Sequence, residues 1–485
     1  MTTNVKPLCN LSKLSYLLDK DGYHSTIHVI LEIKGKPISI SELKTRCREK
    51  LLCYMQFNSY IDFDSLTWNR THVDLNDHIK QHKLDVTHDS IPVSLEKYIS
   101  THISNPLHVN HKPPWNIYSI YQDDPTQNNY ILINVSHALG DGQIITAIVS
   151  SICDNAETHM KKEKRTTSQK QLTPNQLTSN YLTYKEQYTD LLIKQIILIF
   201  MFLAHLLFKW KWVVLFGISY IVYCNLYSFK NFLKLITTTK PTCLRAIPEF
   251  TSHVKLFAKG KPISVLKLKQ IKQKMGFYKE PTINDIMTSL ISKAIGKYHT
   301  YKNIENIPKQ AHVFSLFGLH RKSKNSLDLL QDYADHGKEN DMAYCYIPIS
   351  IDPALSVTKR LQKTQSIMNQ VKNSIDVAVC SIGIKAVQYF PTLIMYIIKY
   401  ITKSVADTYI SNVIVPCNNM SLFGRKVVQV YNCTSPLKLG TTFNILSYND
   451  TITVCSASDK NHIPDPHVLL NYIDEEYQEL CKLDI

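Results

Sequence analysis

A histidine, an aspartate and a glycine stand close together in the chain in a spacing that suits proton transfer. His137 follows a short apolar run, residues 130–135, and Asp141 lies four positions further on, followed at once by Gly142. Imidazole titrates near neutrality, so it can take a proton from a hydroxyl group and return it. His137 is therefore a candidate general base that a neighbouring turn holds in one orientation.

The elements that position this turn follow from the spacing of apolar residues. Residues 130–135 are mostly apolar and rich in β-branched side chains, which predicts a buried strand. From Ile144 on, apolar residues recur at the spacing of one helix face, and Asp141 stands at the N-cap position of that helix. An alternative remains open, in which Asp141 only caps the helix and His137 only fills space.

Several segments resemble the motifs of one enzyme family. The segment HALGDG, from His137 to Gly142, resembles the H-H-x-x-x-D-G motif of CoA-dependent acyltransferases. Further segments are similar to those of the wax ester synthase/diacylglycerol acyltransferase family, in the family's order and over nearly the whole chain. They are VDLNDH (73–78), KPPWN (112–116, with Trp115), PTINDI (281–286, with Asn284 and Asp285), SNV (411–413) and FNILSY (443–448).

The chain departs from the family pattern at two places. Ser136 replaces the first histidine of the doublet, and Val-Pro-Cys at 415–417 stands where Pro-Gly-Pro is usual. In the superfamily the base is the second histidine, which here is His137. The resemblance also implies that Asp141 holds the loop instead of acting on the substrate. Residues 1–25 carry little weight in the comparison.

The resemblance implies an α/β (α+β) fold with two chloramphenicol-acetyltransferase-like domains and an inserted hydrophobic helical segment. His137 is expected to face a channel between the domains, with Asn284 forming a hydrogen bond at the reacting centre or, alternatively, capping a helix. Motif or structural roles are expected for Ser136, Gly142, Asp285 and Trp115. The sequence does not identify the substrate-binding residues.

The expected activity is O-acyl transfer. A fatty acyl group would pass from acyl-CoA to a long-chain alcohol or a diacylglycerol, forming wax esters or triacylglycerol. Two alternatives remain: a relative acting on another alcohol or an amine, and a catalytically silent, membrane-anchored lipid-binding protein. No cofactor is expected beyond the substrate acyl-CoA. No metal site is expected either, because histidine pairs at helix spacing lack an obvious third ligand.

Composition sets the scale of the protein and its partners. A length of 485 residues predicts two domains, at 1–155 and 249–485, joined by a segment at 156–248. The net charge of +15 favours anionic partners, namely the phosphates of CoA or an anionic membrane face, and no nucleic-acid-binding motif is present. The 12 scattered cysteines favour reduced thiols. The oligomeric state is not indicated.

The most hydrophobic part of the chain lies within the predicted connecting segment. Residues 195–229 hold two long apolar runs separated by Lys-Trp-Lys at 209–211. The second run approaches the ~20 residues that cross a bilayer. Two membrane-associated helices are therefore predicted, with a pair of core helices as the alternative. The predicted location is a membrane, at the endoplasmic reticulum or a lipid droplet, with membrane lipid as a partner and the active site facing the cytosol.

Apolar periodicity also predicts the remaining elements. Strands are expected at 25–33, 343–350 and within 427–454, and helices at 41–54, 94–104, 271–299, 356–373 and 465–480. Residues 381–402 form a further apolar segment broken by Pro391, either a membrane-surface element or a half-buried helix.

Overall fold

The computed structural model describes residues 5–154 and 241–482, apart from gaps at 63, 106, 108–110, 248–249, 276–279, 306, 319–327, 329, 332, 335–341, 374–386, 388 and 405. The predicted connecting segment up to residue 240, with the apolar run 195–229, lies outside the described residues. The described elements form three sheets with helices packed against them, a mixed α/β architecture as predicted.

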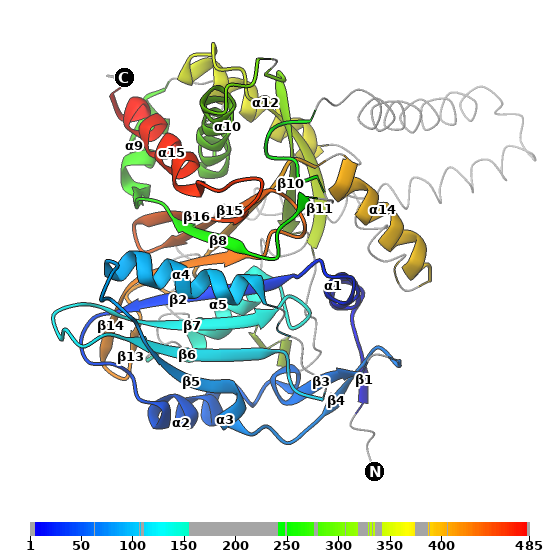
Figure 1. The fold of residues 1–485 in the computed structure, drawn as a ribbon, viewed down its shortest axis with the longest axis vertical. Coiled ribbons are helices and arrows are strands. Elements are labelled where there is room, and N and C mark those ends of the chain that lie inside the picture. Colours follow the sequence, from blue (N-terminus) through cyan, green and yellow to red (C-terminus); the bar gives the residue numbers. More distant parts are fainter. Residues whose placement is uncertain are drawn as a thin grey trace, which may run out of the picture. The chain divides into compact units, whose positions relative to one another are not determined.

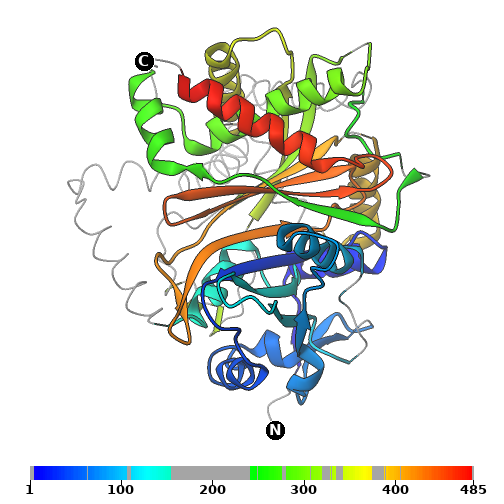
Figure 2. The same cartoon turned by 60° about the vertical axis from the view of Figure 1, so that its left-hand side comes forward.

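The first lobe is built on a sheet with the strand order β13-β14-β2-β7-β6-β5. Its strands are β2 (Thr26–Ile33), β5 (Ile79–Lys83), β6 (Trp115–Tyr121), β7 (Asn129–Ser136), β13 (Ser421–Leu422) and β14 (Arg425–Thr434). The helices of this lobe are α2 (Ile40–Lys50), α3 (Leu75–His78), α4 (Ile91–Ser104) and α5 (Gly142–Ser151). Two of the strands, β13 and β14, come from the second half of the chain, and Figure 2 shows β14 in orange beside β2 in blue.

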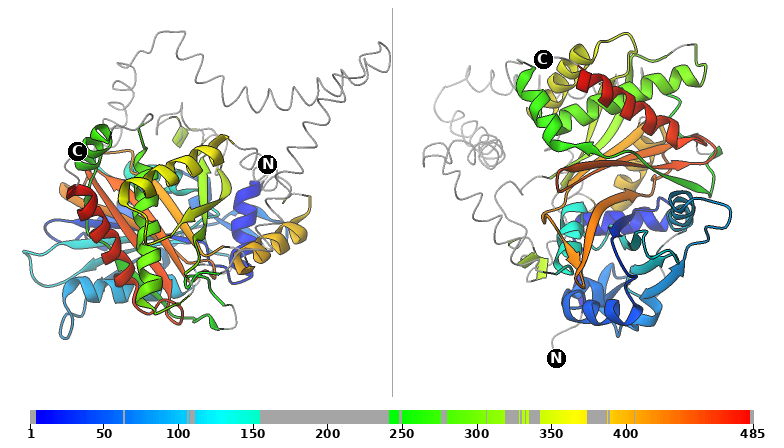
Figure 3. Two further views of the ribbon diagram at one scale, coloured as in Figure 1. Left: turned by 90° about the horizontal axis from the view of Figure 1, so that it is seen from above. Right: turned by 90° about the vertical axis from the view of Figure 1, so that its left-hand side faces the viewer.

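The second lobe has a sheet with the strand order β11-β10-β12-β15-β16-β8. Its strands are β8 (Lys255–Lys259), β9 (Ile263–Ser264, paired with β16), β10 (Gln310–Gly318), β11 (Met342–Ser350), β12 (Thr408–Ile414), β15 (Thr441–Tyr448) and β16 (Thr451–Asp459). Its helices are α9 (Val265–Lys274), α10 (Ile283–Tyr301), α12 (Val357–Asn373) and α15 (Pro466–Lys482). Figures 1 and 3 show α10, α12 and α15 side by side over one face of this sheet.

A small third sheet lies at the N-terminal end of the described chain. It has the strand order β1-β4-β3, with β1 (Val5–Pro7), β3 (Ser59–Asp62) and β4 (Thr67–Arg70). The remaining described elements are α1 (Asn10–Lys20), the single-turn helix η1 (Met55–Asn58) and α14 (Pro391–Ser404). Helix α1 begins after Cys9, whose sulfur accepts a hydrogen bond from the backbone N–H of Ser12, and it packs against α14.

Most of the predicted elements are confirmed, but the single helix at 271–299 is wrong. The chain forms two helices there, α9 and α10, with Pro281 just before the second. Proline restricts the residue before it and lacks a donor for a preceding turn. Thr282 then starts α10 with a capping box, in which its hydroxyl and the carboxylate of Asp285 each accept a backbone N–H bond from the other residue. Thr282 and Asp285 therefore begin a second helix.

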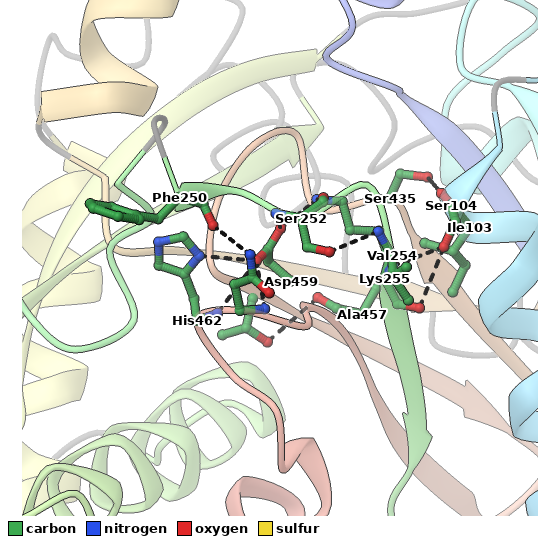
Figure 4. Close-up of polar contacts among 12 residues, drawn as sticks. Ile103, Ser104, Phe250, Ser252, Val254, Lys255, Ser435, Ala457, Asp459 and His462 are labelled. Carbon is green, nitrogen blue, oxygen red and sulfur yellow. Dashed lines mark hydrogen bonds and ion pairs between the residues drawn. The ribbon is translucent and has the colours of Figure 1, made fainter.

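A polar cluster joins the start of the second lobe to α4 of the first. Asp459 is fully buried and receives the Lys255 ammonium at 2.6 Å, the imidazole of His462 at 3.0 Å and the backbone N–H of Ser252 at 2.8 Å (Figure 4). The backbone N–H of Lys255 in turn donates to the Ser104 hydroxyl at 2.8 Å. One carboxylate thus organises the strand that contacts α4.

The predicted membrane location is corrected by the helices of the structure. In the ranges 5–154 and 241–482, with their gaps, none of the helices combines the length and the apolar character that a bilayer crossing requires. The apolar helix α14 has 14 residues, which corresponds to ~21 Å against a hydrocarbon core of ~30 Å.

Removing the buried carboxylate of the lobe junction is expected to destabilise the protein strongly. Asp459→Ala leaves Lys255, whose side chain is 14% exposed, without its counter-charge. Breaking a buried pair in this way costs about 3–5 kcal/mol. Thermal unfolding measures the loss. The matched control is Asp474→Ala, which removes the partner of Lys261, a lysine that is 70% exposed, and should change stability by no more than about 1 kcal/mol. Equal effects of the two variants would contradict this account.

Candidate active site

The structure confirms the strand, turn and helix around His137. Strand β7 ends at Ser136, and the backbone N–H of His137 donates to the carbonyl of Ser25 at 3.0 Å, which fixes the start of the turn on β2. Asp141 is the N-cap of α5, and its Oδ1 accepts from the backbone N–H groups of Gln143 at 2.9 Å and Ile144 at 3.0 Å. Asp141 therefore caps α5, and the hydrogen bonds of this cap do not involve the His137 side chain.

The His137 side chain is buried and electrically neutral at physiological pH. It is 8% exposed, and burial lowers the pKa of the imidazole below the usual 6.5. The carboxylates of Asp141 and Asp19 oppose this shift but do not overcome it. Among the described residues, Nδ1 has no hydrogen-bond partner. A neutral imidazole with an unused ring nitrogen has the protonation state that a general base requires.

Asp19, in the last turn of α1, is a site residue that sequence reasoning missed. Its Oδ1 accepts from the Ser25 backbone N–H at 2.5 Å and from the Ser25 hydroxyl at 3.0 Å, and its Oδ2 accepts from the Ser136 hydroxyl at 3.3 Å. All three residues are buried. Ser136, the departure from the family doublet, is thus part of a carboxylate-centred network that flanks His137. The signal for Asp19 in the sequence is its position as an acidic residue at the end of the amphipathic helix α1, within residues 1–25, which carry little weight in the comparison with the family motifs.

Strand β12 of the second lobe lies against the turn between β7 and α5 that carries His137. A Cβ atom on Gly142 would lie 2.8 Å from Cγ2 of Val413, so only glycine allows this close approach. The next residue back, Asn412, donates from Nδ2 to Oδ1 of Asn284 at 3.0 Å. The predicted residues Gly142 and Asn284 therefore lie on opposite sides of one strand, from two segments far apart in the sequence.

The structure gives Asp285 and Asn284 different roles. Asp285 is buried in the capping box of α10, so the capping role that was the alternative for Asn284 belongs to its neighbour. Asn284 is half-buried, and its side chain contacts Asn412 instead of the helix terminus.

Trp115 is a core residue that joins two of the family-like segments. It is 2% exposed, its ring stacks on His78 with centroids 4.4 Å apart, and its carbonyl lies 2.7 Å from His78 Nδ1. The indole N–H donates to the carbonyl of Phe57 at 2.9 Å. Trp115 therefore supports the sheet that carries His137.

Like Asp19, Tyr333 is a residue near His137 that the sequence did not indicate. It contacts the turn between β7 and α5. Its hydroxyl donates to the carbonyl of Leu139 at 2.7 Å, and its ring is fully buried. Because 194 positions separate the two residues, no local pattern indicates this contact.

Two cavities lie in the first lobe, and His137 lines neither of them. One is a void of about 10 Å³ enclosed by core side chains such as Trp115 and Ile145. The other has a volume of about 430 Å³ and lies around Arg48 and Arg70. The channel expected to lead to His137 between the lobes stays a prediction.

Solved structures with the same fold define the class of protein. The wax ester synthase/diacylglycerol acyltransferase from Marinobacter aquaeolei VT8 matches with a TM-score of 0.56 and 15% identity, covering 98% of each chain. The starter condensation domain of rhizomide synthetase RzmA, in complex with C8-CoA and Leu-SNAC, matches with a TM-score of 0.56 and 10% identity, over 99% of this chain and 94% of that one. The fold is the two-domain fold of condensation domains and chloramphenicol-acetyltransferase-like acyltransferases, as predicted.

Sequence relatives narrow the class to one family. Residues 339–481 match the WS/DGAT C-terminal domain. Wax ester synthase/diacylglycerol acyltransferase 5 of Arabidopsis thaliana is 21% identical over 433 residues, covering 85% of this chain and 80% of the relative. The corresponding enzyme 2 of the same plant is 26% identical over 230 residues, covering 44% of this chain and 46% of the relative. Residues 339–481 thus match this family's C-terminal domain, and the chain is similar over most of its length to wax ester synthase/diacylglycerol acyltransferases.

Substitution of Asp19 is expected to loosen the network beside His137. Asp19→Ala leaves the buried donors of Ser25 and Ser136 without this acceptor, a loss of about 1–3 kcal/mol that thermal unfolding would detect. Asp19→Asn should lose less, because an amide oxygen still accepts. The control is Asp21→Ala, which removes a half-exposed partner of Lys399 and should change stability by about 1 kcal/mol or less. An unchanged melting temperature for Asp19→Ala would refute the network.

Proposed function

We propose that this protein is an O-acyltransferase that moves a fatty acyl group from acyl-CoA to a lipid alcohol, forming wax esters or triacylglycerol. The observation that carries the proposal is a buried, neutral imidazole at the end of β7, in a turn whose residues fit the family motif. The family relatives named above are wax ester synthase/diacylglycerol acyltransferases, which supports this reaction class.

The proposed chemistry needs only one proton carrier. His137 takes the proton of the acceptor hydroxyl while the oxygen attacks the thioester carbonyl. The carbon–sulfur bond then breaks, and the imidazolium gives the proton to the departing CoA thiolate. No covalent acyl-enzyme is required, and the sequence contains no G-x-S-x-G nucleophile elbow. The proposed reaction needs no cofactor, since acyl-CoA takes part in it as the acyl-donating substrate.

Two neighbouring side chains are proposed to support this step. Asp141 holds the turn through its two backbone hydrogen bonds and raises the basicity of His137 by its negative charge. Asn284 is proposed as a hydrogen-bond donor at the reacting centre. Its Oδ1 is engaged by Asn412, an arrangement that leaves the Nδ2 donors of Asn284 to point elsewhere. Long-chain alcohols and diacylglycerols are the acceptors we propose, because the family names point to both.

Replacement of the proposed base is expected to abolish ester formation. Purified full-length protein would be given labelled acyl-CoA with a panel of fatty alcohols and diacylglycerols, and the labelled ester identified. His137→Ala should lower the rate by at least about 100-fold, the usual contribution of general-base catalysis. His253→Ala is the control, since His253 is exposed and outside the site. Activity that survives in a folded His137→Ala variant would contradict the proposal. The proposal would also fail if the unaltered protein formed no ester and bound lipid as well as the His137→Ala variant does.

The pH dependence of the reaction is expected to follow the lowered pKa of His137. Only neutral imidazole can accept the proton, and burial places the pKa of the free protein below 6.5. The value of kcat/KM should therefore be level through pH 7 and fall only at a pH below 6.5, as the imidazole becomes protonated. Initial rates across pH 5–9 with both substrates well below saturation would test this. An acid limb centred above pH 7 would be incompatible with the buried, neutral base.

A further inference from the structure

A basic cavity in the first lobe lies outside the site described above. Its volume is about 430 Å³, within the range of small-molecule sites. The end of α2, the helix η1 and the chain between β4 and α3 form its walls. Arg48, Arg70 and His72 line it, together with Asn58 and the apolar side chains of Leu52 and Leu75. None of these residues belongs to the strand, turn and helix that carry His137.

Two arginines of the cavity have no acidic partner among the residues that the structure describes. Arg48 lies in the last turn of α2, and Arg70 is the last residue of β4; both are exposed. Within the described ranges, no carboxylate forms an ion pair with either. A cation near a helix C-terminus interacts favourably with the helix dipole, which gives Arg48 a structural role. That role does not extend to Arg70. Two guanidinium groups that line one cavity, each able to donate a pair of hydrogen bonds, suit a phosphate.

Asn58 gives the same cavity a fixed polar group. Its Nδ2 donates to the carbonyl of Leu52 at 2.9 Å, which sets the orientation of the amide. Its Oδ1 is buried and has no hydrogen-bond partner in the described part of the chain. The backbone carbonyl of Asn58 accepts from the Thr71 N–H at 3.0 Å and so joins η1 to the end of β4. A buried acceptor that is left unpaired costs free energy, and a ligand donor recovers it once neighbouring side chains move to expose the oxygen, which has almost no accessible surface in this structure.

We propose that this cavity binds a small phosphate monoester that also carries a hydroxyl or amino group. The phosphate lies between Arg48 and Arg70, the donor group satisfies Oδ1 of Asn58, and the carbon skeleton rests on Leu52 and Leu75. This assignment does not depend on the function proposed for His137. Two sources have the required chemistry: a free polyol phosphate, and the ribose phosphate of a nucleotide such as the one in CoA.

Calorimetric titration of the full-length protein at low salt tests the proposal. The probes are inorganic phosphate, glycerol 3-phosphate and adenosine 3′,5′-bisphosphate. One of the two esters should bind at least about tenfold more tightly than inorganic phosphate, which identifies the source. Arg48→Ala and Arg70→Ala should each weaken that ester by about 10- to 100-fold. Arg70→Lys, which keeps the charge but loses the fork, should fall between the unaltered protein and Arg70→Ala.

The control removes the same charge from the same helix end without touching the cavity. Lys50→Ala should change the affinity by no more than about threefold, a value set by screened long-range attraction. Because Arg48 and Arg70 are exposed, their alanine variants should stay folded, and Arg48→Ala should lower the melting temperature only slightly, through the lost helix-dipole interaction. The proposal is overturned if neither ester binds, if binding is indifferent to both arginines, or if Lys50→Ala weakens binding as much as they do.

Discussion

The pairing of β2 with two other strands is the interaction on which the site depends. On one side, Thr26 pairs with Ser136, the last residue of β7. On the other side, Ile27 pairs with Thr434, the last residue of β14, and the next N–H, of Ser435, donates to the Thr26 carbonyl at 3.2 Å. A one-residue slip in either ladder would turn every side chain of the strand to the opposite face. The end of β2 thus fixes where the His137 turn begins.

The second constraint is the charge balance around a buried ring. Burial disfavours the imidazolium form of His137, while two carboxylates attract it. Asp141 belongs to the turn itself, and Asp19 reaches the site from α1 through Ser136. In the proposed reaction the ring is therefore neutral at the start, and the same carboxylates would stabilise the charge that appears once it has taken a proton. Ser136 replaces a histidine of the family doublet at the position that links Asp19 to the end of β7.

Local elements of the fold could be predicted from the sequence, but contacts between distant segments could not. The strand at 130–135 and the helix after Asp141 have clear apolar periods, and the cap has a characteristic residue type. In contrast, the bond from Ser136 to Asp19 spans 117 positions, and only the folded chain brings the two together. A single helix was predicted at 271–299 because apolar residues recur on both sides of Pro281, and this recurrence alone does not show where α9 ends and α10 begins.

The sheet of the first lobe includes β13 and β14 from the second half of the chain, which affects when this sheet can be completed during synthesis. During translation the ribosome completes β7 roughly 300 residues before the end of β14, and β2 earlier still, at a rate of about 5–20 residues per second. The nascent first lobe therefore presents an unpaired, apolar strand edge for tens of seconds, the kind of edge that promotes association between chains. A fragment ending before residue 425 would keep that edge permanently, so the sheet of the first lobe is incomplete without the second half of the chain.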